Sequence, residues 1–420
     1  MFVYTVKSGD SLFTISQKYD ISMDSIRSVN GLIRPTIVPG QALLIDTNVY
    51  TIQPGDSFYT ISQMAYIPLD RLMAANPELH PYFLQPGTKI VLPELPEYTT
   101  SVLNYLFITG TQNDSLFIND FAPYTTYYSF FRYYFNVDGS LSSLDDLTAI
   151  ESAWNSHTAP LMTITNLTAA GFSGVLTSET LNNASSRLNL VNNIFTLVTQ
   201  RGYAGVNIDF EGTLPEDRTI FTRFLSELGD LLHEAGLLLT IAIPPKTSED
   251  IPWYAGYDYE AIGSIVDFMF IMTYNWHHTA SEPGPVAPIR PVRNTIEFAL
   301  EKMDSRKVIL GIPLYGFHWT LPYHLENLAT AVSNQDAIDF AMNNNIPIHY
   351  STEDETPYFY YVDEAGQRHV VWFEDTRSIA AKMQLVREYQ LQGIGAWQIG
   401  FGFSQGPWLL TKFFNIRKVT

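Results

Sequence analysis

Apolar runs of strand length alternate with longer stretches over the last three quarters of the chain. The runs are rich in Val, Ile, Leu, Phe and Tyr, and most are separated by spacers long enough for a helix. Continuous apolar runs are typical of parallel strands that are buried on both faces. Eight such runs are present, at residues 101–110, 126–135, 161–166, 204–211, 237–244, 265–274, 307–316 and 393–400.

Two of the spacers show clear helix ends. Residues 178–202 and residues 215–236 each read as one helix, and each ends at a glycine. Eight strands that alternate with helices over about 300 residues predict an α/β fold, a (β/α)8 TIM barrel. A doubly wound sheet is the alternative that the same alternation permits.

The spacer between the seventh and eighth runs is longer than the others. It contains a helix-like stretch, "NQDAIDFAMNNNIP", and an aromatic stretch, "TPYFYYVDEAGQRHVVWF". The "VDEAGQR" segment inside the second stretch favours a hairpin turn. We therefore expect a small α+β subdomain, inserted into the barrel over residues 321–373.

An internal repeat occupies the first 93 residues. "YTVKSGDSLFTISQ" and "YTIQPGDSFYTISQ" share nine of fourteen positions at an offset of 46. Each unit reads as strand, helix, helix, strand, which predicts two small βααβ modules at 1–47 and 48–93. Asp10 and Asp56 follow the first turn of each unit, and we expect them to cap the next helix. The proline-containing segment 94–101 reads as a linker to a large domain at 102–420.

Both repeats resemble the LysM module nearly from end to end. LysM modules bind glycans that contain N-acetylglucosamine, such as peptidoglycan and chitin. The resemblance therefore implies a glycan partner. A pair of small repeats that serves only packing or assembly is the alternative.

Composition and charge narrow the classes of partner. The chain has 420 residues, of which 46% are hydrophobic and 16% charged, and this indicates a globular, core-forming protein. The net charge is −19, and residues 1–93 contribute about −1 of it. A polyanion would be repelled by the larger part of the molecule, so we expect no nucleic-acid partner.

Several further features are expected to be missing. The absence of cysteine excludes disulfides and thiolate catalysis. No apolar run is long enough for a membrane span, and "MFVYTVKSGD" does not read as a signal peptide. "WHH" at 276–278 could bind a metal, but adjacent histidines on a loop more often make hydrogen bonds. We expect a monomer that needs neither metal nor cofactor.

The stretch "GVNIDFEG" departs from the apolar pattern of the other runs. Side chains alternate along a strand, so Asn207, Asp209 and Glu211 would face the barrel interior, and the apolar residues between them would face the outer helices. Burial of unpaired carboxylates costs on the order of several kcal/mol, so a purely structural strand would avoid them. Glu211 falls at the end of the strand where barrel active sites lie. The stretch therefore predicts a catalytic strand.

Two carboxylates that lie two residues apart on a strand, as Asp209 and Glu211 do, can act as one unit. Their backbones are about 6.6 Å apart, so the side chains can share a proton or a hydrogen bond. Coupling and burial raise one pKa, which makes Glu211 the candidate general acid and Asp209 the group that tunes and orients it. The strand offers no second carboxylate on the far side of a sugar ring. This fits a mechanism in which the substrate supplies its own nucleophile, for example a 2-acetamido carbonyl.

"AGVNIDFEG" resembles the DGxDxDxE signature of glycoside hydrolase family 18. Asp209 and Glu211 match the last two acids of that signature. Ala204 stands where the family has its first Asp, and Asn207 stands where it has its second. The resemblance implies that Glu211 protonates the glycosidic oxygen, and that the loss of charge at 207 alters the pH profile of the acid pair.

Three further segments resemble the same family, in the family's order. "MTYN" resembles its MxYD motif, which implies that Tyr274 hydrogen-bonds the acetamido group and that Asn275 replaces an Asp. "GIPLYG" resembles its GxPxYGR segment without the Arg, and it contains Tyr315. "GIGAWQIG" resembles its final strand, where Trp397 would form the floor of the −1 sugar site. The residues expected to contact substrate are Asn207, Asn275, Tyr315 and Trp397.

The domain order resembles that of the spore cortex-lytic enzymes of endospore formers. The resemblance implies a retaining β-N-acetylglucosaminidase that acts on spore cortex peptidoglycan or its fragments during germination, in the coat or cortex layers. A chitinase and a non-catalytic, glycan-binding coat protein are the alternatives. The retained Glu211 favours an enzyme, and the lack of a visible signal peptide disfavours a secreted chitinase.

Overall fold

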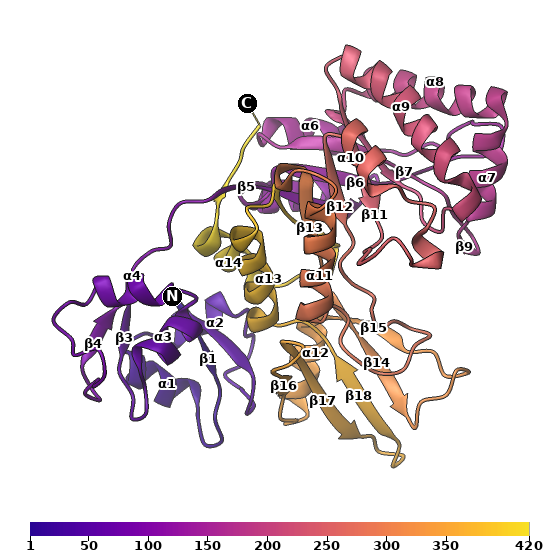
Figure 1. Ribbon diagram of the computed structural model, residues 1–420. Coiled ribbons are helices and arrows are strands. Elements are labelled where there is room, and N and C mark those ends of the chain that lie inside the picture. The colour runs from indigo at the N-terminus through magenta and orange to yellow at the C-terminus, as the bar shows by residue number, and fades with distance from the viewer. Residues whose placement is uncertain (420) are drawn as a thin grey trace.

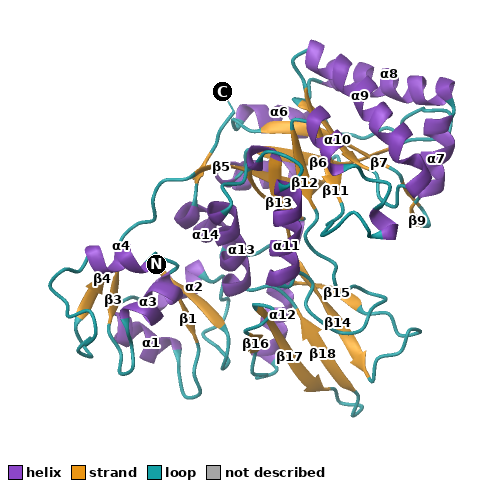
Figure 2. Cartoon of the chain, viewed as in Figure 1, coloured by secondary structure: helices purple, strands orange, loops and turns teal. Residues whose placement is uncertain are grey.

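Eight parallel strands close into a barrel in the computed structural model, which describes residues 1–419 (Figures 1 and 2). The ring closes where β19 pairs with β5. Closure confirms the (β/α)8 barrel and excludes the doubly wound sheet. The strands in chain order are β5 (Thr99–Phe107), β6 (Tyr127–Tyr134), β7 (Ala159–Thr165), β10 (Gly205–Asp209), β11 (Leu238–Ile243), β12 (Phe268–Ile271), β13 (Val308–Pro313) and β19 (Gly393–Trp397).

Helices follow the strands and surround the barrel. They are α5 (Gln112–Phe121), α6 (Leu147–Asn155), α7 (Gly174–Asn182), α8 (Ala184–Arg201), α9 (Arg218–Glu234), α10 (Tyr259–Ile265), α11 (Ile289–Leu300), α13 (Thr376–Glu388) and α14 (Gly406–Phe413). The single helix predicted over 178–202 is wrong. It is the end of α7 followed by α8, because the Asn183 side chain accepts the backbone N–H groups of Ser185 and Ser186 and so starts a new helix. Within residues 1–419, no helix combines the length and apolarity that a membrane crossing needs.

Short elements fill the remaining loops of the barrel domain. Two small strands form a hairpin after β7, and one more strand extends the sheet beside β5. These elements are β8 (Leu167–Thr168), β9 (Gly171–Phe172), β20 (Asn415–Ile416) and the 3-10 turns η1 (Ala122–Tyr124), η2 (Pro215–Asp217), η3 (Pro252–Tyr254), η4 (Ser305–Lys307) and η5 (Ile399–Phe401).

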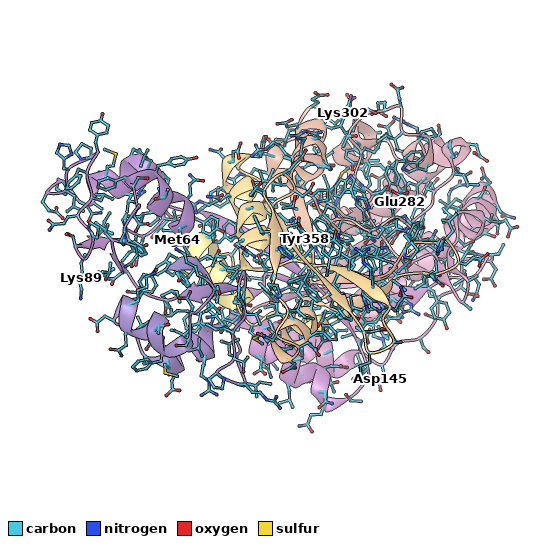
Figure 3. All side chains as sticks on the ribbon, turned by 90° about the horizontal axis from the view of Figure 1, so that it is seen from below. Met64, Lys89, Asp145, Glu282, Lys302 and Tyr358 are labelled. Carbon is cyan, nitrogen blue, oxygen red and sulfur yellow. The ribbon has the colours of Figure 1, made fainter. Side chains whose placement is uncertain are left out.

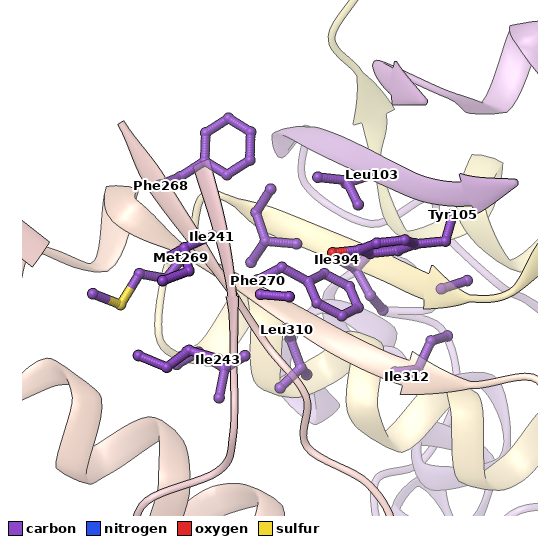
Figure 4. Close-up of a cluster of buried hydrophobic side chains, with 14 of the residues drawn as sticks. Leu103, Tyr105, Ile241, Ile243, Phe268, Met269, Phe270, Leu310, Ile312 and Ile394 are labelled. Atoms are coloured by element: carbon purple, nitrogen blue, oxygen red, sulfur yellow. The ribbon is translucent and has the colours of Figure 1, made fainter. Parts of the chain in front are cut away.

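Aliphatic and aromatic side chains of the barrel strands form a buried apolar cluster (Figure 4). The rings of Tyr105 and Phe270 meet edge to face with centroids 5.0 Å apart. Glycines at 311 and 395 make room for them, because a Cβ at either position would lie 2.7 Å from the ring of Phe270. The glycines of "GIPLYG" and "GIGAWQIG" therefore have a packing role as well as a place in a motif.

The insertion between β13 and α13 is an antiparallel sheet of five strands with one helix. The sheet order is β15-β14-β18-β17-β16, and the predicted hairpin joins β17 to β18. The first strand begins at Tyr315, directly after the end of β13, rather than at the expected residue 321. The elements are β14 (Tyr315–Leu321), β15 (Thr330–Ser333), α12 (Asn334–Asn343), β16 (His349–Ser351), β17 (Thr356–Val362) and β18 (Arg368–Trp372).

The two N-terminal modules share one βααβ plan, each with an antiparallel strand pair. Module 1 contains β1 (Phe2–Thr5), α1 (Leu12–Tyr19), α2 (Met23–Val29) and β2 (Ala42–Ile45). Module 2 contains β3 (Val49–Thr51), α3 (Phe58–Ala65), α4 (Leu69–Ala74) and β4 (Lys89–Val91).

The predicted helix caps of the modules are wrong by one residue. Ser11 and Ser57 cap α1 and α3 through capping boxes. Asp10 instead accepts the hydroxyl of Tyr4 at 2.6 Å and the backbone N–H of Lys7 at 2.8 Å, and Asp56 repeats this pattern in module 2. The aspartates therefore hold the turn closed against the first strand.

Module 1 is fixed to the insertion and to α13. The backbone N–H of Ile348 donates to the carbonyl of Pro39 at 2.9 Å, and the Arg377 guanidinium donates to the carbonyl of Gly40 at 3.1 Å. Leu43 in module 1 belongs to the same apolar cluster as Ile338 in α12. Since hydrogen bonds and a shared core both cross the junction, this module is docked on the barrel domain.

A glycine substitution tests this docking. A Cβ at Gly40 (φ +83°) would lie 1.7 Å from the carbonyl oxygen of Ile348, whereas Gly9 (φ +88°) has no atom within 4 Å of that position. Alanine at either site suffers the left-handed strain of about 1–2 kcal/mol. We expect Gly40→Ala to lower the thermal unfolding midpoint by several degrees more than Gly9→Ala in scanning calorimetry. Equal losses would contradict the close contact.

Candidate active site

The three polar residues of β10 point into the barrel, as predicted. The apolar side chains between them face outward, and Phe210 stacks on Phe224 of α9 with ring centroids 5.6 Å apart. Asn207 and Asp209 are buried within the strand, and Glu211 follows its carboxyl end. Because side chains alternate between the two faces of the strand, both carboxylates lie at the mouth of the barrel.

A cavity of about 560 Å³ opens at this mouth. It is lined by both carboxylates, Asp209 and Glu211, and by four further residues that the sequence singled out, namely Tyr274, Asn275, Tyr315 and Trp397. These residues come from β10, from the loop after β12, from the start of the insertion and from β19. The fold therefore brings together side chains that lie up to almost 200 residues apart in the sequence.

Burial changes the acidity of the carboxylate pair. It raises the pKa of Glu211 to about 7. Burial also raises the pKa of Asp209 well above its usual range, and the charge of Glu211 raises it further. The Oδ1 atom of Asp209 has no hydrogen-bond partner within residues 1–419. The pair consequently retains a proton near neutral pH, which a general acid requires.

Asn207 does not line the cavity, so the structure does not support its predicted contact with substrate. Its amide donates to the hydroxyl of Tyr105 at 2.8 Å and accepts from the hydroxyl of Thr240 at 2.9 Å. These bonds connect β10 to β5 and β11 across the barrel interior below the cavity. Because Asn207 is neutral, Asp209 has one charged neighbour on its own strand, Glu211, instead of two.

Asn166 fixes the backbone at Glu211 from both sides. This residue directly follows β7, and its Oδ1 atom accepts the Glu211 N–H at 3.0 Å while its Nδ2 atom donates to the Glu211 carbonyl at 2.7 Å. The same Nδ2 atom donates to the Thr177 hydroxyl at 3.0 Å. The paired bonds hold the acid in a single backbone position after the strand has ended. Sequence reasoning missed Asn166, because nothing local in "LMTITN" relates it to residue 211.

Aromatic residues build the floor and one wall of the cavity. Trp397 meets the ring of Phe131 at 4.9 Å and that of Tyr105 at 5.3 Å, both edge to face. The Tyr315 hydroxyl donates to the Asn275 side chain at 2.7 Å. Tyr274 is buried beside Tyr315, with ring centroids 6.3 Å apart. The rings are thus supported by other rings, which favours a rigid, preformed site.

Five cavity aromatics were not predicted from the sequence. They are Tyr105, Phe172, Trp253, Tyr254 and Tyr257. Trp253 is 69% exposed and lies on η3, in the loop after β11. The cluster "PWYAGYDY" at 252–259 was the available signal, since it places four aromatics in the segment that follows the strand predicted at 237–244. Exposed aromatic faces at the rim suit the apolar faces of a sugar.

The loop histidines are engaged with the backbone. His277 Nδ1 lies 2.8 Å from the Glu282 carbonyl, and His278 Nδ1 accepts the Ala280 N–H at 3.3 Å. Within residues 1–419, no three His, Asp or Glu side chains gather as a metal site would require.

Comparisons with known proteins agree with this geometry. The family model for "Glycosyl hydrolases family 18" matches residues 80–402, and that for the LysM domain matches residues 4–46 and 50–93. The chain is 52% identical over 420 residues to YdhD of Bacillus subtilis (strain 168), provisionally named a sporulation-specific glycosylase, with 100% of both chains covered. It is 40% identical over 431 residues to the cortical fragment-lytic enzyme of the same organism, also with 100% of both covered.

A solved structure extends the likeness to three dimensions. The crystal structure of the Bacillus cereus spore cortex-lytic enzyme SleL matches with a TM-score of 0.90 at 35% identity, over 100% of this chain and 99% of that chain. The arrangement of modules, barrel and insertion is therefore shared over the whole length.

The buried acid has a measurable cost in stability. Between the ordinary glutamic acid pKa of 4.5 and the raised value of about 7, folded Glu211 holds a proton that the unfolded chain has lost. The free energy of unfolding therefore falls as the pH rises through this window. We expect Glu211→Gln to be more stable than the parent at pH 8, by about 3 kcal/mol, and to gain little at pH 4.5.

Urea denaturation at both pH values measures this difference. Glu179→Gln, on the exposed surface of α7, serves as the control and should show no such gain at pH 8. A stability difference for Glu211→Gln that does not vary with pH would contradict the raised pKa.

Proposed function

Since the chain belongs to the glycosyl hydrolases of family 18 and carries two LysM domains, we propose that it is a β-N-acetylglucosaminidase of the spore cortex. It is a glycoside hydrolase, and its proposed substrate is cortex peptidoglycan or the fragments released from it during germination. The support is the likeness, over the whole chain, to enzymes named for cortex lysis. The same likeness supports a location in the coat or cortex layers of a spore.

The single observation that carries the catalytic proposal is the buried Glu211 at the barrel mouth. With a pKa of about 7, its carboxyl is protonated often enough at neutral pH to donate to a glycosidic oxygen. Once it has given up that proton, the same carboxylate can accept one from an incoming water. One residue thus serves both half-reactions.

The nucleophile in this proposal comes from the substrate. Asp209 is the other carboxyl group that lines the cavity, and it lies one step deeper on the same side of β10. In this proposal Asp209 holds the acetamido nitrogen and the Tyr274 hydroxyl, which lines the same cavity, binds the same acetamido group. The acetamido carbonyl then attacks the anomeric carbon, an oxazolinium ion forms, and water opens it with net retention.

Trp397 and Asn275 complete the sugar site. The indole ring forms the floor, where it meets the apolar face of the −1 sugar. The Tyr315 hydroxyl donates to the Asn275 side-chain oxygen, so the Asn275 amide N–H groups and the oxygen of Tyr315 are oriented before substrate arrives. The site needs no metal or cofactor for these steps.

The LysM modules bind the polymeric substrate of the barrel domain. A bound module holds the catalytic site near uncut bonds and so raises their effective concentration. Module 1 is docked on the insertion and on α13, so its position relative to the barrel is fixed.

Glu211→Gln tests the catalytic role. We expect kcat on cortical fragments to fall by about 10²–10⁴-fold, because the amide cannot donate a proton to the leaving group. Binding of the fragments should persist. In the parent enzyme, kcat/KM should fall as the pH rises through about 7, as Glu211 loses its proton.

Mass spectrometry of the products from spore peptidoglycan provides the readout. New reducing ends should be N-acetylglucosamine, and chitin oligomers should be cleaved less efficiently. Retention of parental turnover by Glu211→Gln would refute the proposal, and a preference for chitin oligomers would favour a chitinase instead.

Asn166→Ala tests the backbone clamp on the acid. Loss of both bonds frees residue 211, and a shift of about 1 Å in a reacting group can cost on the order of 10²-fold in rate. We expect a drop in kcat with little change in KM. The upper pH midpoint of activity should also move below about 7, because water gains access to the Glu211 carboxyl.

The control is Asn193→Ala, which removes an exposed asparagine whose amide donates to the Gly139 carbonyl at 2.9 Å, outside the cavity. A merely structural role for Asn166 would lower stability and leave the pH midpoint in place. That result would contradict the proposal that Asn166 positions Glu211 for catalysis.

A further inference from the structure

The residues that directly follow β10, at 210–213, form a short segment that carries the general acid, and we call it the acid segment. Phe210 and Thr213 are buried at its two ends, and Gly212 has a φ of +68°. The Tyr257 hydroxyl donates to the Phe210 carbonyl at 2.8 Å and accepts the Thr213 N–H at 3.2 Å. These two bonds lie on either side of Glu211, so one side chain joins both ends of the acid segment.

Tyr257 and Asn166 hold the acid segment from opposite sides. Asn166 directly follows β7 and Tyr257 lies in the loop after β11, and these two strands are the neighbours of β10 in the barrel. Asn166 binds the N–H and the carbonyl of Glu211 itself, whereas Tyr257 binds the flanking Phe210 and Thr213. Two side chains therefore fix four backbone groups around the acid.

Backbone of the neighbouring loops also lies close against the acid segment. A Cβ at Gly256, next to Tyr257, would lie 2.3 Å from the carbonyl oxygen of Thr213. On the other side, a Cβ at Gly174 would lie 2.0 Å from the carbonyl oxygen of Gly212. The segment is thus confined by packing as well as by hydrogen bonds.

A buried lysine that the catalytic proposal does not use holds Tyr257 in turn. The Lys246 side chain is fully buried, and its ammonium donates to the Tyr257 carbonyl at 3.1 Å and to the Glu249 carboxylate at 2.7 Å. The same ammonium lies 5.9 Å from the ring centroid of Phe298 in α11. A buried ammonium is unfavourable unless it is paired and hydrogen-bonded, and both hydrogen-bond partners lie in the loop after β11. Lys246 therefore fixes the loop that presents Tyr257.

The Tyr257 hydroxyl is a donor over the whole range in which Glu211 titrates. The side chain is 1% exposed, and its ring meets Phe221 of α9 edge to face at 5.9 Å. Burial raises the pKa of Tyr257, the hydrogen bond with Thr213 opposes this rise, and the charges of Glu211 and Asp209 add to it. The hydroxyl therefore keeps its proton and its bond to the carbonyl of residue 210.

We propose that Tyr257 is a positioning residue for catalysis: its hydroxyl fixes the acid segment, so that the Glu211 carboxyl is aimed at the glycosidic oxygen and shielded from water. The inference rests on the proposed function, because it takes Glu211 as the proton donor. It adds that the loop after β11, held by Lys246, determines where that donor stands. Tyr257 acts through the backbone of the acid segment.

Tyr257→Phe tests the role of the hydroxyl, since it keeps the ring that packs on Phe221. We expect kcat on cortical fragments to fall by about 10- to 100-fold with little change in KM, because a small displacement of a reacting group is costly in rate. The upper pH midpoint of activity should move below about 7, because water gains access to the Glu211 carboxyl.

The matched control is Tyr128→Phe. Tyr128 is also buried, and its hydroxyl donates to the Ile118 carbonyl at 2.8 Å, between β6 and α5 and outside the cavity. Both variants should lose a similar amount of thermal stability, and Tyr128→Phe should keep the parental kcat and pH midpoint. A Tyr257→Phe enzyme that loses stability but keeps the parental kcat and pH midpoint would overturn the proposal.

A second pair of variants covers the case in which Tyr257→Phe does not fold. Lys246→Met removes the ammonium that holds the Tyr257 carbonyl, and it should lower kcat and the pH midpoint in the same direction. Lys302 is the control, because its ammonium lies over the same Phe298 ring, at 5.7 Å, but at the edge of the molecule (Figure 3). Lys302→Met should behave like the parent. Parental kcat and pH midpoint in Lys246→Met would contradict the proposal.

Urea denaturation separates this inference from the proposed catalysis, because it needs no turnover. The stability that Glu211→Gln gains at pH 8 should shrink by about half in the Tyr257→Phe background, since the Glu211 pKa there lies closer to its ordinary value. An unchanged gain, together with an inactive Glu211→Gln enzyme, would refute the positioning role alone. A reduced gain, together with parental turnover of Glu211→Gln, would support the contact and place the failure in the proposed function.

Discussion

A pair of carboxyl groups, buried at the mouth of the barrel with no basic partner among residues 1–419, is the constraint on which the rest of the structure depends. Asp209 and Glu211 stand on one side of β10, and burial raises the pKa of both. Such an arrangement is unfavourable for folding and favourable for proton transfer, so the surrounding fold must hold it in place. Three contacts meet that requirement. The amide of Asn166 binds the backbone of Glu211, and the ring of Phe131 packs against Trp397. The uncharged side chain of Asn207 hydrogen-bonds Tyr105.

The barrel supplies this support because its strands are far apart in sequence and adjacent in space. Glycines on β13 and β19 leave room for Phe270, whose ring packs against Tyr105 from the opposite side of the interior. Tyr105 in turn receives the hydrogen bond of Asn207, directly below the acid pair. A change of one side chain in this interior layer would therefore be transmitted to the carboxylates through two contacts.

Periodic and repeated features were predictable from the sequence. The eight strands, the two modules, the inserted hairpin and the inward side of β10 follow from apolar runs, an offset repeat and strand alternation. Features that depend on tertiary contacts could not be predicted from the sequence. Asn166 acts on a residue 45 positions away, and Asn207 turned out to bind other barrel strands rather than to line the cavity. The caps at Ser11 and Ser57 were missed because Asp10 and Asp56 are better satisfied by tyrosines on the preceding strand.

The docking of module 1 fixes where a bound glycan would lie relative to the barrel. A flexible tether would raise the local concentration of any glycan that the modules bind, with no fixed geometry between module and barrel. Module 1 is instead held through the Gly40 carbonyl, which accepts from Arg377 of α13, and through the Pro39 carbonyl, which accepts from the backbone of Ile348 in the insertion. A glycan on this module would therefore be held at one distance and in one orientation from the cavity that contains Glu211.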